Sequence, residues 1–292
     1  MKVDPVRGTK QGSSIRRRTV FLAVAALAVF LCAAYLLVGI VAGSIELPRN
    51  ALWEVVHNVC VPGQLQRGDP MPCLQVSVSE GIDRGFAVLR DPRGGTQFLL
   101  IPTTPISGIE STRARERGAA NYFDLAWEAR TNLNQVLQRE LPRDDVGLAI
   151  NSIVSRSQDQ LHIHFSCIRP DVYKTLHEKG QGIGGHWAPF RAKLYWQPYL
   201  AMWVPGDRLG AHNPFRLLAE DVPGASSNMA NRTLLVFGLT RSDGTLGFVL
   251  LAGEVNIPHG DLGNGEELLD NSCQIAAKGK GGAAWPQQNQ AK

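Results

Sequence analysis

Two histidines stand two positions apart in the stretch QLHIHFSCI, residues 160–168. Apolar residues alternate with them, a pattern typical of a β-strand with one buried face. Because successive side chains of a strand point to opposite faces, His162 and His164 are expected on the same face. A neutral imidazole can attack phosphorus and is a good leaving group when charged, so this pair is suited to covalent chemistry on a phosphate.

Three interpretations of the pair are open. In the first, the two histidines are packed and hydrogen-bonded in the protein interior and have no catalytic role. A metal site would use both rings but needs a third ligand, and the candidates His57, His186 and Glu220 have no spacing that favours them. A nucleophilic histidine held against a phosphate is the third interpretation.

The segments around the pair predict both strands and helices. Two apolar runs at 86–89 and 98–101 flank a Gly-rich turn and predict a β-hairpin, and residues 235–253 repeat this plan. A helix is expected from Asn121, with Asp124 in a capping-box-like position and Pro142 at its end. The further expected elements are a short helix near Pro48 or Arg49, strands in VGLAINSI and QLHIHFSCI, and a helix over 171–179.

Residues 19–45 carry no charged side chain, and such a run is long enough for a helix to cross a bilayer. The basic residues of 1–18 predict a cytoplasmic N-terminus, which places the rest across the inner membrane in the periplasm. The expected organisation is a cytoplasmic segment 1–18, a transmembrane anchor 19–45, a catalytic domain 46–277 and a disordered tail 278–292. A cleaved signal peptide is the alternative to the anchor.

Charge argues against a nucleic-acid partner. Residues 1–18 hold six basic side chains and one acidic side chain, whereas the remainder holds 24 basic and 25 acidic side chains. A nucleic-acid-binding domain usually has a basic surface on its folded part. The folded part of this chain is close to neutral, so we expect no nucleic-acid partner.

Four cysteines follow the apolar run, and an even number in an oxidising compartment suggests two disulfides. Cys60 and Cys73 bracket a turn-rich loop that a disulfide could close, which would leave Cys167 for Cys273. Spacing alone does not choose among the three possible pairings.

Four stretches, FLLIPTTPISGIES, NYFDLAWEAR, LAINS and QLHIHFSCIRPDV, together resemble the CDP-diacylglycerol pyrophosphatase family, a membrane-bound family of the histidine triad superfamily. The resemblance covers residues 48–275. It implies an α+β fold in which a histidine-triad-like antiparallel sheet carries helices, preceded here by one transmembrane helix. It also implies hydrolysis of CDP-diacylglycerol to CMP and phosphatidate through a histidine-nucleotidyl intermediate, with no cofactor and no metal.

The resemblance implies a role for each motif residue. His162 takes the place of the nucleophile and His164 that of a donor to the phosphate oxygens, while Gln160 stands where the superfamily has its first histidine. An Asn on the preceding strand and small polar residues in the turn match the remaining substrate-binding positions: Asn151, Ser157 and Gln158. Turn chemistry alone also explains the polar residues between the strands.

Two further functions remain open on the sequence. The same histidine chemistry could act on another nucleotide diphosphate or transfer the nucleotidyl group to an acceptor other than water. Alternatively, the chain could be an anchored nucleotide-binding module in which Gln160 marks lost turnover. The expected partners are CDP-diacylglycerol in the bilayer and membrane lipid, and the sequence gives no oligomeric state.

Overall fold

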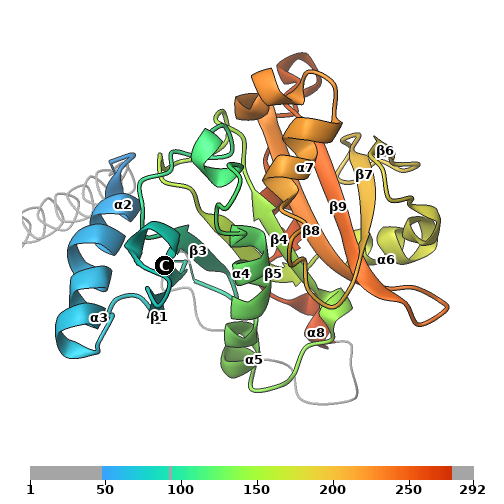
Figure 1. Cartoon of the computed structure of the whole chain (residues 1–292). Helices are drawn as coiled ribbons and strands as arrows, with labels where there is room; N and C mark the ends of the chain where they lie inside the picture. The colour runs from blue at the N-terminus through green and yellow to red at the C-terminus, as the bar shows by residue number, and fades with distance from the viewer. Residues whose placement is uncertain (1–47, 92–93, 278–292) are drawn as a thin grey trace, which may run out of the picture. The chain divides into compact units, whose positions relative to one another are not determined.

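The computed structural model describes residues 48–91 and 94–277. Its strands form one antiparallel sheet in the order β1-β2-β3-β5-β4-β8-β9-β7-β6, and β10 also pairs with β5 (Figure 1). Their bounds are β1 Gln75–Ser77, β2 Phe86–Arg90, β3 Phe98–Pro102, β4 Val146–Ile150, β5 Ile163–Ile168, β6 Ala188–Pro189, β7 Leu200–Pro205, β8 Arg232–Thr240, β9 Leu246–Glu254 and β10 Leu269–Asp270. The predicted antiparallel sheet with helices is therefore present.

The α-helices are short and lie on the sheet or at its ends (Figure 1). Their bounds are α2 Ala51–Val55, α3 Val61–Arg67, α4 Tyr122–Ala129, α5 Thr131–Leu137, α6 Pro170–Lys179, α7 Pro214–Asp221 and α8 Gln274–Ala277. A π-helical stretch, η1 (Val56–Cys60), joins α2 to α3. Single 3-10 turns are η2 Ile82–Arg84, η3 Thr112–Ala114, η4 Arg143–Asp145, η5 Gly180–Gly182, η6 Ala225–Ser227, η7 Met229–Asn231, η8 Ile257–His259 and η9 Gly265–Leu268.

The two faces of the sheet are covered differently. One face carries the largest apolar cluster, in which Phe165 of β5 packs with residues of α4 and α7. The other face carries two separate clusters, one under α2 and α3 that includes Leu99 of β3, and one under α6 that includes Ala149 of β4. His164 of β5 pairs with both Leu99 and Ala149. The histidines therefore lie on the second face, between its two apolar clusters.

Two of the boundaries that differ from the sequence-based predictions have a clear structural cause. The predicted helix from Asn121 is capped as expected, since the Asn121 side chain accepts a hydrogen bond from the Asp124 amide. However, it is divided into α4 and α5 and ends at Leu137, because Gln138 adopts a left-handed backbone conformation with φ 51°. The strand predicted over 160–168 begins at Ile163, because the Leu161 amide donates to the Ile106 carbonyl of a loop and joins no strand ladder.

The predicted transmembrane helix and the inner-membrane location need correction. In 48–91 and 94–277, no helix is both long and apolar enough to span a bilayer. The segment 19–45, where the anchor was expected, lies outside the described residues, as do the basic segment 1–18 and the tail 278–292. The described residues form an α+β fold without a membrane-spanning helix. They give no support to the predicted single-pass location in the inner membrane.

Two disulfides link distant parts of the fold. Cys60 is bonded to Cys73, which ties the π-helical stretch to the loop before β1. Cys167 of β5 is bonded to Cys273, which ties the C-terminal segment to the strand that follows the histidine motif. This is the pairing that the loop between Cys60 and Cys73 suggested.

Candidate active site

His162 stands immediately before β5 and is held by its own segment. Its Nδ1 lies 2.6 Å from the backbone carbonyl oxygen of Gln160. A carbonyl oxygen only accepts hydrogen bonds, so Nδ1 carries the proton and Nε2 keeps its lone pair. Burial lowers the pKa of His162, while the carboxylate of Glu266 acts in the opposite direction. The ring is therefore neutral near pH 7, with an unprotonated Nε2.

His164 lies beside His162 on the same face, as the alternation predicted. The two ring centroids are 4.8 Å apart and the ring planes are inclined at 72°. The exposed fraction is 6% for His162 and 2% for His164, so both rings are almost entirely shielded from water. The two imidazoles form one buried unit.

The Gln97 amide determines the tautomer of His164. Gln97 directly precedes β3, and its Nε2 lies 2.6 Å from His164 Nδ1. The same NH2 group donates to Asp91 Oδ2 at 3.2 Å and to Glu266 Oε2 at 2.8 Å. Carboxylate oxygens accept only, so they require the NH2 end of the amide here. His164 Nδ1 then accepts from Gln97, and His164 Nε2 carries the proton.

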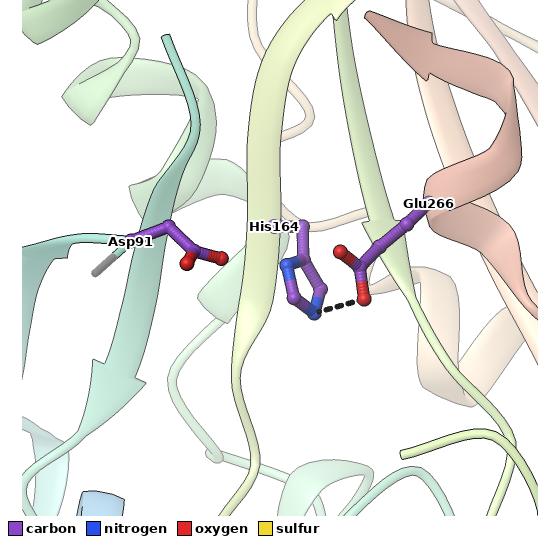
Figure 2. A group of neighbouring side chains, drawn as sticks. All are labelled: Asp91, His164 and Glu266. Atoms are coloured by element: carbon purple, nitrogen blue, oxygen red, sulfur yellow. Dashed lines mark ion pairs between the residues drawn. The ribbon is translucent and has the colours of Figure 1, made fainter. Parts of the chain in front are cut away.

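Two carboxylates flank His164 (Figure 2). Asp91 follows β2 directly, and Glu266 comes from η9, on the other side of the ring. Glu266 Oε1 lies 3.1 Å from His164 Nε2. This contact joins β5 to η9, which lies about 100 residues later in the chain.

Asn151, a predicted substrate-binding residue, holds η9 in place. It follows β4 directly, and its Nδ2 donates to Glu266 Oε1 at 2.7 Å. Its Oδ1 accepts from the amides of Gly265 at 2.9 Å and Glu266 at 3.4 Å. Gly265 has no room for a side chain, because a Cβ there would lie 2.7 Å from Thr233 Oγ1. The absence of that Cβ lets η9 approach β4 closely enough to bring Glu266 to His164.

Asp91, His164 and Glu266 are residue types that can bind a divalent ion. Each offers one ligand atom, and these atoms lie within 4.8 Å of one another. None of the third ligands considered from the sequence, His57, His186 and Glu220, belongs to this group. The NH2 group of Gln97 lies among the three, and its two N–H bonds are shared between one acceptor atom of each. We therefore describe the group as a hydrogen-bond network around Gln97.

Gln160, at the first position of the motif, supports a neighbouring loop. Its Oε1 accepts from the Ile106 amide at 3.3 Å, and its Nε2 donates to the carbonyls of Pro102 and Thr104, each at 3.0 Å. The side chain is 1% exposed. A buried backbone group without a hydrogen-bond partner costs free energy. The Gln160 side chain supplies partners to three such groups, which gives it a structural role.

The turn between β4 and β5 places the two other predicted residues differently. Ser157 is exposed, and its carbonyl accepts from Gln158 Nε2 at 3.1 Å. Gln158 is buried, and its Oε1 accepts from the Leu52 amide at 3.0 Å, so it ties the turn to α2. Neither side chain is in contact with His162 or His164 through the hydrogen bonds that the described residues make. Both remain predictions as substrate-binding residues.

Arg156 of the same turn brings a positive charge close to His162, where it lowers the pKa of that ring. Its guanidinium is buried, and it pairs with Glu110 at 2.6 Å and with Asp159 at 3.0 Å. These two ion pairs hold the turn in place.

No motif in the sequence indicated Asp91, Gln97, Arg156 or Glu266. The positions of Asp91 and Gln97 carried a usable signal, because each is a polar residue at the end of a predicted strand, where sites are often built. Glu266 lies in the stretch GNGEELL, whose composition and spacing are those of an ordinary turn. The pairing of β10 with β5 and the close approach of η9 to β4 at Gly265 bring it to the site.

Comparison with known families identifies the relatives of this chain. The family model described as CDP-diacylglycerol pyrophosphatase matches residues 47–277. The chain belongs to this family. A relative from Yersinia pestis that is named CDP-diacylglycerol pyrophosphatase is 38% identical over 226 residues, which cover 77% of this chain and 84% of the relative. The family inferred from the motif is confirmed, and with it the enzyme class, a hydrolase acting on CDP-diacylglycerol. The histidine triad superfamily remains a prediction.

A solved structure of a DUF4931 family protein from Bacillus cereus is also similar. It shares 11% identity, with a TM-score of 0.36, and the match covers 62% of this chain and 84% of that protein. At this distance the similarity carries no conclusion.

Proposed function

We propose that the chain hydrolyses the pyrophosphate bond of CDP-diacylglycerol to CMP and phosphatidate, with His162 as the nucleophile. One observation carries this assignment, the 2.6 Å contact between His162 Nδ1 and the Gln160 carbonyl oxygen. It fixes the proton on Nδ1 and leaves the lone pair on Nε2 for attack on phosphorus. Burial lowers the pKa of the ring, which keeps this lone pair available near pH 7.

The proposed reaction has two displacements. In the first, the Nε2 lone pair forms a bond to the phosphorus next to cytidine, and the bond from that phosphorus to the bridging oxygen breaks. Its electron pair stays on that oxygen, which leaves as part of phosphatidate. In the second, a water oxygen attacks phosphorus, the N–P bond returns its electrons to Nε2, and a water proton passes to solvent. Two smaller barriers replace one large one.

The leaving group suits a site with glutamine at the first position. Phosphatidate leaves as a phosphate monoester, a group whose second pKa is about 6, so it departs without a proton at neutral pH. Gln160 cannot supply a proton, and its amide is engaged by three backbone groups. The proposed substrate therefore does not depend on an acid at this position.

The remaining residues are assigned to charge and position. Arg156 supplies a positive charge close to the phosphates, and stabilisation of charge by fixed groups contributes most of the rate in phosphoryl transfer. We assign His164 Nε2–H as a donor shared between a phosphate oxygen and the Glu266 carboxylate, whose Oε1 lies 3.1 Å from that nitrogen. The two imidazoles pack together, which limits the rotation of each.

The lipid substrate is proposed to be bound from a bilayer or micelle. Moving acyl chains into water costs about 0.8 kcal/mol per CH2, so a diacylglycerol nucleotide remains in its lipid phase. The assay must therefore present the substrate in detergent or vesicles.

The deciding experiment incubates the full chain with CDP-diacylglycerol in mixed micelles and measures released CMP. His162→Ala is expected to lower this rate by about 10³-fold or more, because the nucleophile is lost. His186→Ala, which changes an exposed histidine, is the matched control and is expected to keep wild-type activity. Trapping of a cytidylyl adduct on His162 would support the covalent step.

Two outcomes would contradict the proposal. CMP release by His162→Ala at the wild-type rate would exclude His162 as the nucleophile. Nucleotide binding without CMP release by folded wild-type protein would favour a binding module over an enzyme.

A further inference from the structure

Glu266 links three segments that carry site residues. Its Oε1 accepts from Asn151 Nδ2 at 2.7 Å and lies 3.1 Å from His164 Nε2, while its Oε2 accepts from Gln97 Nε2 at 2.8 Å. Its own amide is also bound, by Asn151 Oδ1. A carboxylate with partners on both oxygens and on its backbone has little freedom to rotate. Its position relative to His164 is therefore fixed by the fold.

Among the described residues, the groups that face His162 come from several elements. Glu266 of η9 and Asp91, which follows β2, favour the charged form of the ring, whereas Arg156 of the turn after β4 opposes it. His164 of β5 lies against the ring, with centroids 4.8 Å apart, and is neutral when Nδ1 accepts from Gln97. Glu266 Oε1 also lies 3.1 Å from Nε2 of His164, the neighbouring imidazole of the motif.

His162 must gain a positive charge in the proposed reaction. When Nε2 bonds to phosphorus while Nδ1 keeps its proton, the ring becomes cationic. A buried cation is costly unless a fixed negative charge compensates for it. Such compensation is realised only after the ring reacts, so it accelerates formation of the intermediate rather than substrate binding.

We infer that Glu266 is a positioning residue of the proposed reaction: it holds His164 beside His162, and its negative charge stabilises the cationic His162 ring of the intermediate. This inference rests on the proposed function. It assigns a role to a residue that no motif indicates, and it explains why Asn151, Gly265 and Gln97 are arranged around one carboxylate. Glu266 acts through the histidines and need not touch the substrate.

The test compares Glu266→Gln with Glu267→Gln. Both replace a carboxylate of η9 by an amide of the same shape, but Glu267 accepts from Asn264 and has no hydrogen bond to either histidine. Glu266→Gln is expected to lower kcat for CMP release by about 10-fold to 100-fold, by analogy with the carboxylates that orient metal-binding histidines. KM should change less than kcat, and Glu267→Gln should resemble the wild type.

The pH profile separates this role from a purely structural one. The Glu266 charge raises the pKa of His162, so its removal lowers that pKa further. The acid limb of kcat/KM is expected to move to lower pH in Glu266→Gln, even though kcat falls. Glu266→Asp, which keeps the charge and shortens the reach, should retain the wild-type acid limb with a reduced kcat.

Several outcomes would overturn the inference. The first is wild-type kinetics in Glu266→Gln. The second is a fall in kcat of Glu266→Gln that comes with a lower unfolding temperature and an unmoved acid limb of kcat/KM. If Glu266→Gln does not fold, the deciding result is a wild-type kcat in Glu266→Asp. Absence of CMP release by the wild type would overturn the proposed function together with this inference. Normal wild-type turnover with an unaffected Glu266→Gln would overturn the inference alone.

Discussion

The surroundings of His162 and of His164 differ in how far along the chain their partners lie. His162 bonds to the carbonyl of Gln160, two residues earlier, and Gln160 itself holds the 102–106 loop. His164 is surrounded by a set that we call the His164 cluster: Asp91, Gln97, Asn151 and Glu266. These residues come from the ends of β2, β3 and β4 and from η9.

This difference separates two tasks within one short segment of the chain. The contact of His162 sets a tautomer and requires only the local backbone. The His164 cluster sets charge and orientation, and it requires the register of β5 with β3, β4 and β10. Changes in the cluster should therefore alter rate and pH dependence, whereas changes around Gln160 should mainly alter stability.

The largest expected effect within this comparison is that of His164→Ala. Loss of the imidazole removes one donor to the phosphate and the packing partner of His162, and we expect kcat for CMP release to fall by about 10²-fold. Steady-state kinetics on CDP-diacylglycerol micelles would measure this fall. The matched control is His186→Ala, at an exposed histidine. A His164→Ala enzyme with unchanged kcat would show that the second histidine has no role in turnover.

The next largest effect is expected on stability, from Gln160→Ala. This change leaves the Ile106 amide and the Pro102 and Thr104 carbonyls without their partner, which should lower the free energy of unfolding by about 1–3 kcal/mol. Urea unfolding would measure the loss. Gln135→Ala, at an exposed position of α5, should change stability little. If Gln160→Ala were as stable as the wild type but inactive, Gln160 would act on the substrate instead.

The sequence predicted what depends on local pattern. The alternation around His162 and His164 predicted their shared face, the Gly-rich turn predicted the hairpin of β2 and β3, and Asn121 was correctly predicted as a helix cap. Each of these features follows from steric or hydrogen-bonding preferences of neighbouring residues.

The His164 cluster could not be predicted in the same way. Glu266 reaches His164 because β10 pairs with β5 and because Gly265 allows close approach to β4, and both depend on the whole sheet. The start of β5 was also mispredicted, since the segment before Ile163 bonds to a loop that alternation cannot reveal. Apolarity over 19–45 led to a membrane-spanning helix as part of the fold, which the described residues do not contain.

A smaller effect is expected in the pH dependence of the wild type. Burial lowers the pKa of His162 below its ordinary value of 6.5. His162 attacks only when neutral, so kcat/KM should hold as the pH falls through 6.5 and decline only at lower pH. A pH series of kcat/KM, with the unfolding temperature followed at each pH, would measure this. An acid limb at or above pH 6.5 would mean that the carboxylates of the His164 cluster outweigh the burial of His162.

The smallest expected effect is that of metal removal, and it concerns the His164 cluster alone. Asp91, His164 and Glu266 could bind a divalent ion only if the Gln97 NH2 group, whose two N–H bonds are shared among the three, moved away. Breaking those hydrogen bonds inside a buried site costs energy, so the network competes with an ion for the same acceptors. Dialysis against EDTA should therefore leave CMP release unchanged. If EDTA abolished activity and a divalent ion restored it, the cluster would be a metal site, and Gln97→Ala should then raise its affinity for that ion.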